Sequence, residues 1–107
     1  MRDFKNIHKA MGLVATKMQN DPRMMADKEM LSYNNAALEL FTNTKPVFAM
    51  VDGRMVDVKR AVSRRIARIM KRKGIDWKAL WTTIIEFVEE HWWEILKIAI
   101  SIFMFML

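Results

Sequence analysis

The sequence contains no cysteine, which excludes disulfide bonds, thiol catalysis and cysteine-ligated metal sites. Only two prolines and three glycines occur among 107 residues. A β-rich fold needs many turns, so this scarcity of turn-forming residues favours helices. A chain of this length forms one domain at most. We therefore expect an all-α protein of three or four helices.

Motifs that carry catalysis are lacking as well. The two histidines, His8 and His91, lie far apart in the sequence, and HExxH, GxxxxGK[ST], GxGxxG and GxSxG are all absent. The glutamates of residues 86–94 have the spacing of one polar helix face, and no nucleophile, base and orienting group come together. We expect a protein that is not an enzyme and that uses neither a cofactor nor a metal.

Two helices are expected in the first part of the chain. Apolar residues recur at steps of three and four along residues 2–19, which indicates an amphipathic helix. Asn20, Asp21 and Pro22 mark its end, because Asp21 can cap the next helix and proline suits a first helical position. The second helix is expected to cover residues 22–42, although the neighbouring Asn34 and Asn35 weaken it locally.

Residues 47–58, with the sequence VFAMVDGRMVDV, are ambiguous. Asp52-Gly53 between two apolar stretches is typical of a β-hairpin turn. The same stretch can form a helix that is interrupted at Gly53. We favour the helix, because a lone two-stranded hairpin is only marginally stable and no third strand is apparent.

Residues 54–73 show the clearest helical pattern and most of the positive charge. They hold nine Lys or Arg and one Asp, whereas residues 74–107 are net acidic. Met55, Val58, Val62, Ile66 and Ile69 project to one side of the helix, and Lys59 lies near that side with a stem long enough to snorkel. The side chains expected to contact headgroups or phosphates are Arg60, Arg64, Arg65, Arg68, Lys71, Arg72 and Lys73.

This basic helix has three interpretations that the sequence leaves open. It can present a solvated face, contact the headgroups of an anionic membrane, or bind the phosphates of a nucleic acid. No aromatic residue lies between the arginines to stack on bases. Any binding to nucleic acid is therefore expected to be independent of base sequence and sensitive to salt.

Residues 77–107 are expected to form one long helix of about 45 Å, capped by Asp76. Most of its circumference is apolar. A narrow polar stripe with a period of about 3.6 residues runs along it. The stripe consists of Asp76, Thr83, Glu86, Glu90, Glu94, Lys97 and Ser101, in which Glu94 and Lys97 can pair.

The end of this helix is a candidate membrane or assembly anchor. Residues 95–107 are apolar apart from Lys97 and Ser101, but a full bilayer span needs about 20 such residues, so the case is borderline. Trp92 and Trp93 precede the apolar run, where an interfacial aromatic belt lies. The first eleven residues lack the apolar core of a secretory signal, so membrane contact is expected through the C-terminal end. The expected anchor residues are Trp92, Trp93, Ile95, Ile98, Ile102, Phe103, Phe105 and Leu107.

The sequence thus predicts a compact helical region, residues 1–73, followed by an anchor helix, residues 75–107. A monomer of this size is expected to leave the tryptophans and the apolar end uncovered, which implies a membrane lipid or protein partner, including self-association. With its short chain, basic segment and apolar end, the sequence resembles small phage or viral membrane-associated structural proteins in general layout. We expect a membrane-anchored structural or interaction protein whose basic helix contacts headgroups or nucleic acid. The positive-inside rule puts its N-terminal region on the inner, cytoplasmic side of a cellular or virion membrane.

Two other hypotheses remain open. The protein can be a soluble oligomeric scaffold or nucleic-acid-packaging protein in which the last helix forms the assembly core. It can also be a holin-like or toxin-like protein that permeabilises membranes, with the polar stripe lining a pore. Nucleic acid is a possible partner both in the membrane-anchored hypothesis and in the packaging alternative.

Overall fold

The computed structural model describes residues 4–76 and 78–103 of the chain, which are mostly helical. The predicted helical class is therefore confirmed, with one β-hairpin added to it. The elements are α1 (Lys5–Met18), α2 (Pro22–Met25), α3 (Lys28–Thr42), β1 (Phe48–Val51), β2 (Arg54–Asp57), α4 (Val58–Arg72), α5 (Trp81–Glu90) and α6 (Trp92–Phe103).

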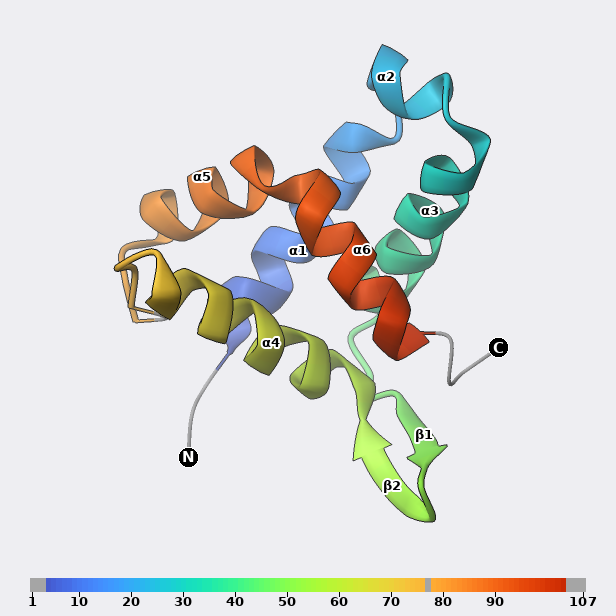
Figure 1. Cartoon of the computed structure of the whole chain (residues 1–107), viewed down its shortest axis with the longest axis vertical. Coiled ribbons are helices and arrows are strands. Elements are labelled where there is room, and N and C mark those ends of the chain that lie inside the picture. The colour runs from blue at the N-terminus through green and yellow to red at the C-terminus, as the bar shows by residue number, and fades with distance from the viewer. Residues whose placement is uncertain (1–3, 77, 104–107) are drawn as a thin grey trace.

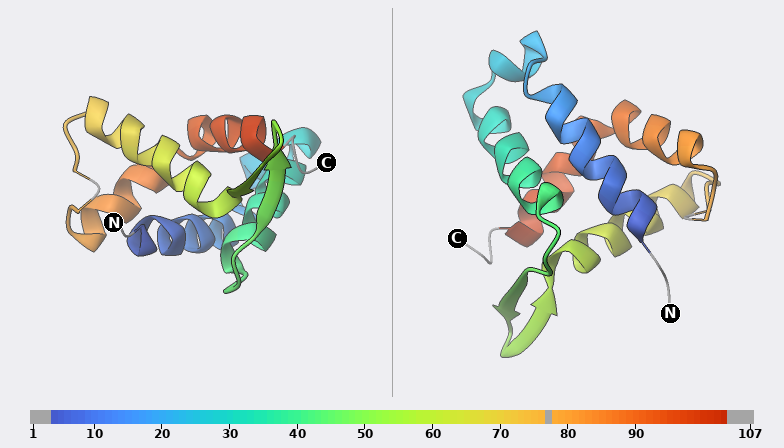
Figure 2. Two further views of the ribbon diagram at one scale, coloured as in Figure 1. Left: turned by 90° about the horizontal axis from the view of Figure 1, so that it is seen from below. Right: turned by 180° about the vertical axis from the view of Figure 1, so that it is seen from behind.

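The helices form two layers (Figures 1 and 2). Seen from behind, α1 lies between α3 and α5, and the contacts agree with that placement. On the opposite side, α4 and α6 lie together and pack on each other. The hairpin of β1 and β2 projects from one end of the helical body. One core is therefore shared by helices from both ends of the chain.

The core is filled by apolar side chains from α1, α3, α4, α5 and α6. Ile7 and Met11 of α1, Ile66 of α4, Ile84 of α5 and Ile95 of α6 are all buried. The predicted amphipathic helix at residues 2–19 is confirmed as α1, because its apolar side is the one that faces this core. Burial of apolar surface on this scale is the main stabilising contribution to the fold.

One buried polar bridge crosses the core between the two layers. The Nε1 of Trp92 donates to the Oδ1 of Asn34 at 2.8 Å, and the Nδ2 of Asn34 donates to the carbonyl oxygen of Ala15 at 3.0 Å. All three residues are buried. Asn34 therefore ties α6 to α3 and α1, although in the sequence it only looked like a weak helix former.

The predicted single helix over residues 22–42 is wrong, because the structure divides it into α2 and α3. Asp21 does cap α2 as expected, with its carboxylate accepting from the backbone N–H of Arg23 at 2.8 Å. A second cap follows, in which Asp27 accepts from the backbone N–H of Met30 at 3.1 Å. Asp27 has an extended backbone, so the helix restarts there.

The predicted helix over residues 47–58 is also wrong, and the hairpin that we set aside is present. Asp52 and Gly53 both have positive φ, 51° and 76°, as a two-residue type I′ turn requires. The strands pair antiparallel, with Met50 opposite Met55. Helix α4 consequently begins at Val58, where the Asp57 carboxylate accepts from the backbone N–H of Arg60 at 3.1 Å.

The long helix predicted over residues 77–107 is wrong as a continuous element. It begins only at Trp81 and breaks at His91, which has φ −103° and ψ 22° and separates α5 from α6. A straight helix of about 45 Å would exceed the longest dimension of the molecule, 38 Å. The break lets the apolar sides of α5 and α6 face the same core, with Phe87 and Trp92 buried on either side of it.

The expected anchor residues are distributed through this fold. Trp92 and Ile95 are fully buried, while Trp93, Ile98 and Ile102 are half-buried. The expectation that a monomer cannot cover its tryptophans is wrong for Trp92. Within residues 4–76 and 78–103, no helix combines the length and the apolar content required to cross a bilayer. The predicted roles of the Phe103, Phe105 and Leu107 side chains, and of Trp77, fall outside the described residues.

Candidate anion-binding surface

Helix α4 divides its side chains between the core and the surface. Val58, Val62 and Ile66 are buried, and Met70 continues that side. At about 100° per residue, the exposed cations occupy an arc of roughly 120° on the other side of the helix. We call these five exposed cations the basic face: Arg64, Arg65, Arg68, Lys71 and Arg72.

The basic face carries no ion pair within the described part of the chain. The ion pairs among the described residues are Lys17–Glu89, Arg23–Asp21 and Lys73–Glu94, and the His91 ring lies 3.7 Å from the Glu94 carboxylate. Five cations therefore lie close together with no carboxylate beside them to neutralise their field. Such an arrangement attracts anions, because its positive potential is not cancelled locally.

Lys73 differs from the other predicted contact residues. Its Nζ lies 3.8 Å from the carboxylate of Glu94 and 3.5 Å from the Nδ1 of His91. Lys73 therefore has a different role from the other residues predicted to contact headgroups or phosphates, because it joins the end of α4 to α6. Glu94 pairs here with Lys73 and His91, and the Glu94–Lys97 pair expected from the sequence is not among the ion pairs of the described residues.

Lys59 is buried and has a structural role. Its Nζ donates to the carbonyl oxygens of Asn43 and of Lys45, at 2.8 Å for Lys45. Burial lowers the pKa of this amine, and the nearby Asp57 carboxylate opposes that shift. Lys59 therefore fastens the loop that leads into β1 against α4. The sequence placed Lys59 near the apolar side of the helix, which could have identified it as a core lysine.

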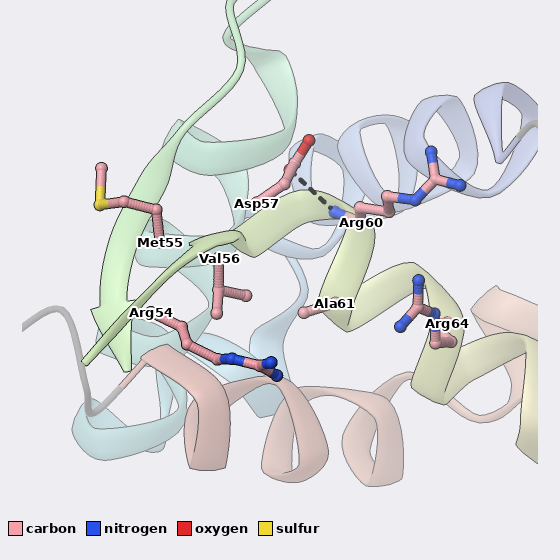
Figure 3. Close-up of a pocket in the computed structure, with 7 residues that line it drawn as sticks. All are labelled: Arg54, Met55, Val56, Asp57, Arg60, Ala61 and Arg64. Atoms are coloured by element: carbon pink, nitrogen blue, oxygen red, sulfur yellow. Dashed lines mark hydrogen bonds between the residues drawn. The ribbon is translucent and has the colours of Figure 1, made fainter. Parts of the chain in front are cut away.

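A hollow of about 520 Å³ lies where β2 meets α4. In Figure 3 the guanidinium groups of Arg54 and Arg64 lie on either side of Ala61, while that of Arg60 points elsewhere. The guanidinium carbon of Arg60 lies 5.7 Å from the centre of the Phe4 ring. We call this cavity the arginine hollow, lined by Arg54, Met55, Val56, Asp57, Arg60, Ala61 and Arg64.

Arg54 was missing from the predicted contact set. The sequence placed Arg54 at the start of the predicted basic helix, residues 54–73, whereas in the structure it belongs to β2 and lines the hollow from there. The one acid in the hollow, Asp57, is already engaged in capping α4. A guanidinium presents a planar fork of N–H donors that matches the oxygens of a phosphate, so the hollow suits a phosphate group.

A second, smaller hollow continues the basic surface toward α6. It has a volume of about 220 Å³ and is lined by Arg65, Arg68, Ile69, Arg72 and Ile98. Ile98 was expected in the anchor, but here it contributes an apolar wall beside three arginines. The cationic surface therefore extends along α4 from the hairpin to the last turns of the helix.

The polar stripe is mostly acidic, in contrast to the basic face, and it faces solvent. Glu86, Glu90, Glu94 and Lys97 are exposed on α5 and α6. Nearby Glu89 pairs with Lys17 of α1. Among the described residues, no cluster of three or more His, Asp or Glu side chains could hold a metal ion. The stripe is therefore the solvated side of two core helices.

Comparison of the chain with protein-family models, with curated proteins and with solved structures gave no match.

Proposed function

We propose that this protein is a non-enzymatic interaction protein that binds the phosphate groups of an anionic surface through α4. The observation that carries the proposal is the basic face, five exposed cations without an ion-pair partner in the described residues. Arg54 extends this face onto the hairpin. Lipid headgroups and nucleic acid present the phosphate chemistry that such a face recognises.

The strength of such binding follows from charge and not from shape. A cationic side chain near an anionic membrane contributes about 1 kcal/mol. Cations that neutralise nucleic-acid phosphates gain from counterion release, which makes affinity fall steeply with salt. Both kinds of binding therefore weaken at high ionic strength, and both depend on the number of free cations that the surface presents.

The test removes three charges from the basic face and compares the result with the same loss elsewhere. The variant Arg65→Gln/Arg68→Gln/Arg72→Gln is matched by Lys28→Gln/Lys45→Gln/Lys97→Gln, whose lysines are exposed on other parts of the surface. Binding to phosphatidylglycerol vesicles and to duplex DNA is measured at low and at physiological salt. The arginine variant should lose about 100-fold in affinity for whichever probe binds, since three contacts of about 1 kcal/mol are removed.

Two outcomes would contradict this proposal. One is that neither probe binds the full chain at low salt. The other is that the lysine control loses as much affinity as the arginine variant, because the effect would then reflect net charge and not the basic face.

The C-terminal membrane anchor expected from the sequence stays a prediction. In the structure, Trp92, Ile95, Leu96 and Ala99 are fully buried against the other helices. Insertion of α6 into a bilayer would have to withdraw these side chains from the core. The alternatives of an oligomeric assembly core and of a pore also stay predictions, together with the expected membrane localisation.

A further inference from the structure

The hairpin presents a row of large apolar side chains to solvent. Phe48, Met50 and Met55 are 55%, 59% and 66% exposed. Phe48 and Met50 alternate onto the same side of β1, and Met55 lies directly opposite Met50 in the register. We call these three side chains the outer face of the hairpin.

Within residues 4–76 and 78–103, no other element covers the outer face, whose three side chains stay more than half exposed. The hairpin projects from the helical body (Figures 1 and 2), and Ala49, on the other side of β1, packs against the core together with Val47. Large apolar side chains grouped on a projecting element commonly mark an interaction site.

The outer face and the arginine hollow involve the same hairpin. Met55 lines the arginine hollow together with Arg54, Arg60 and Arg64. Figure 3 shows the Met55 side chain on the side of the hairpin away from the Arg54 and Arg64 guanidinium groups. The Met55 side chain and the guanidinium groups of the arginine hollow therefore lie on different sides of one projecting element.

We propose that the hairpin is an interfacial wedge that enters the headgroup layer of an anionic membrane. Phe48, Met50 and Met55 lie at the acyl boundary, and Arg54 and Arg64 bind lipid phosphates. This inference rests on the proposed function and names its partner. The long arginine stems allow the guanidinium groups to remain at headgroup level while the neighbouring side chains go deeper. Asp52 at the turn stays with the headgroups.

The chemistry of the outer face favours lipid over the other partners. Two of the three side chains are flexible thioethers, which fit fluid hydrocarbon, and only Phe48 has a ring that could stack on a base. A second copy of the chain would need about 800 Å² on each partner for a stable interface, and three side chains fall well short of that. The hydrocarbon of a membrane is fluid, so it can surround three side chains without a large interface of matching shape.

The experiment uses the full chain and its lack of cysteine. Met50→Cys provides a single site for an environment-sensitive dye, and Met25→Cys, at a residue also 59% exposed but on α2, is the matched control. Dye emission is recorded on phosphatidylcholine vesicles with and without phosphatidylglycerol. Emission should shift to the blue only for the Met50→Cys label, and only on the anionic vesicles.

A second pair of variants tests the contribution to affinity. Met50→Ser/Met55→Ser should weaken binding to the anionic vesicles by about tenfold or more, because two apolar side chains no longer leave water. Leu13→Ser/Met25→Ser removes two exposed apolar side chains elsewhere and should leave binding unchanged. Duplex DNA is measured in parallel for every variant.

The outcomes separate this inference from the proposed function. Vesicle binding without a blue shift, or binding that the Met50→Ser/Met55→Ser variant retains in full, overturns the wedge and leaves the basic face in place. Binding to DNA but not to vesicles overturns the wedge in the same way. Failure of the full chain to bind either probe overturns both proposals.

Discussion

At the scale of single residues, two polar side chains decide how the helices fit together. Asn34 bridges Trp92 and Ala15 inside the core, and Lys59 holds the loop before β1 through the carbonyl oxygens of Asn43 and Lys45. Buried polar groups of this kind are tolerated only when they are hydrogen-bonded. Both residues are therefore parts of the fold and not of a ligand site.

Replacing Asn34 tests this bridge. Asn34→Ala leaves the Trp92 indole N–H and the Ala15 carbonyl buried without this partner, so the free energy of unfolding should fall by about 2 to 3 kcal/mol. Asn35→Ala is the control, because Asn35 is the exposed neighbour of the same type and alanine is the better helix former. Urea denaturation measures both variants. Equal stability of the two would show that the bridge contributes nothing.

At the scale of elements, the hairpin depends on the backbone of its Asp52-Gly53 turn, and the separation of α5 from α6 depends on the break at His91. Gly53 has φ +76°, and nothing lies within 4 Å of where a Cβ would be placed. The cost of a side chain there is therefore purely a backbone cost. Gly74, with φ +80° at the end of α4, has the same open surroundings and offers a comparison.

Gly53→Ala should loosen the hairpin by about 1 to 2 kcal/mol, which is the cost of a left-handed backbone for an L-residue. Amide hydrogen exchange of β1 and β2 should accelerate roughly tenfold, while the core helices keep their protection, because the hairpin projects from the body. Gly74→Ala carries the same backbone cost but should leave exchange in the hairpin unchanged. Acceleration throughout the helices with Gly53→Ala would contradict the peripheral position of the hairpin.

At the scale of the whole molecule, the two ends of the chain are interdependent. α5 packs on α1, and α6 packs on α4 and α3. The sequence suggested a compact region at residues 1–73 that precedes an anchor, whereas the structure puts Trp92, Ile95 and Leu96 in the same core as α1.

A chain that ends at Gly74 should therefore fail to fold on its own. Without α5 and α6, the apolar sides of α1 and α4 face water, and a remainder this small is marginal at best. Circular dichroism should show reduced helix and no cooperative thermal transition, in contrast to the full chain. Adding the peptide of residues 75–107 should restore the transition. A cooperative transition in the truncated chain alone would support the anchor hypothesis instead.

Much of the architecture follows from local sequence. The helical class, the amphipathic helices α1 and α4, the boundary at Asp21 and Pro22, and the clustering of cations on one side of α4 were all predictable. These features depend on the spacing of apolar residues and on caps within a few positions, so a short window of sequence contains the information.

Tertiary structure decided the rest, because the relevant partners are distant in sequence. Periodicity shows which side of residues 81–103 is apolar, but it cannot say whether lipid, another chain or α1 covers that side. The helix break at His91 and the hydrogen bond between Trp92 and Asn34 depend on contacts that form only when the layers pack. At residues 47–58 the local turn signal of Asp52 and Gly53 was in the sequence, and the flanking Val47 and Ala49 also pack against the core. Arg54 was expected at the start of the basic helix, but it lines the arginine hollow from β2 instead.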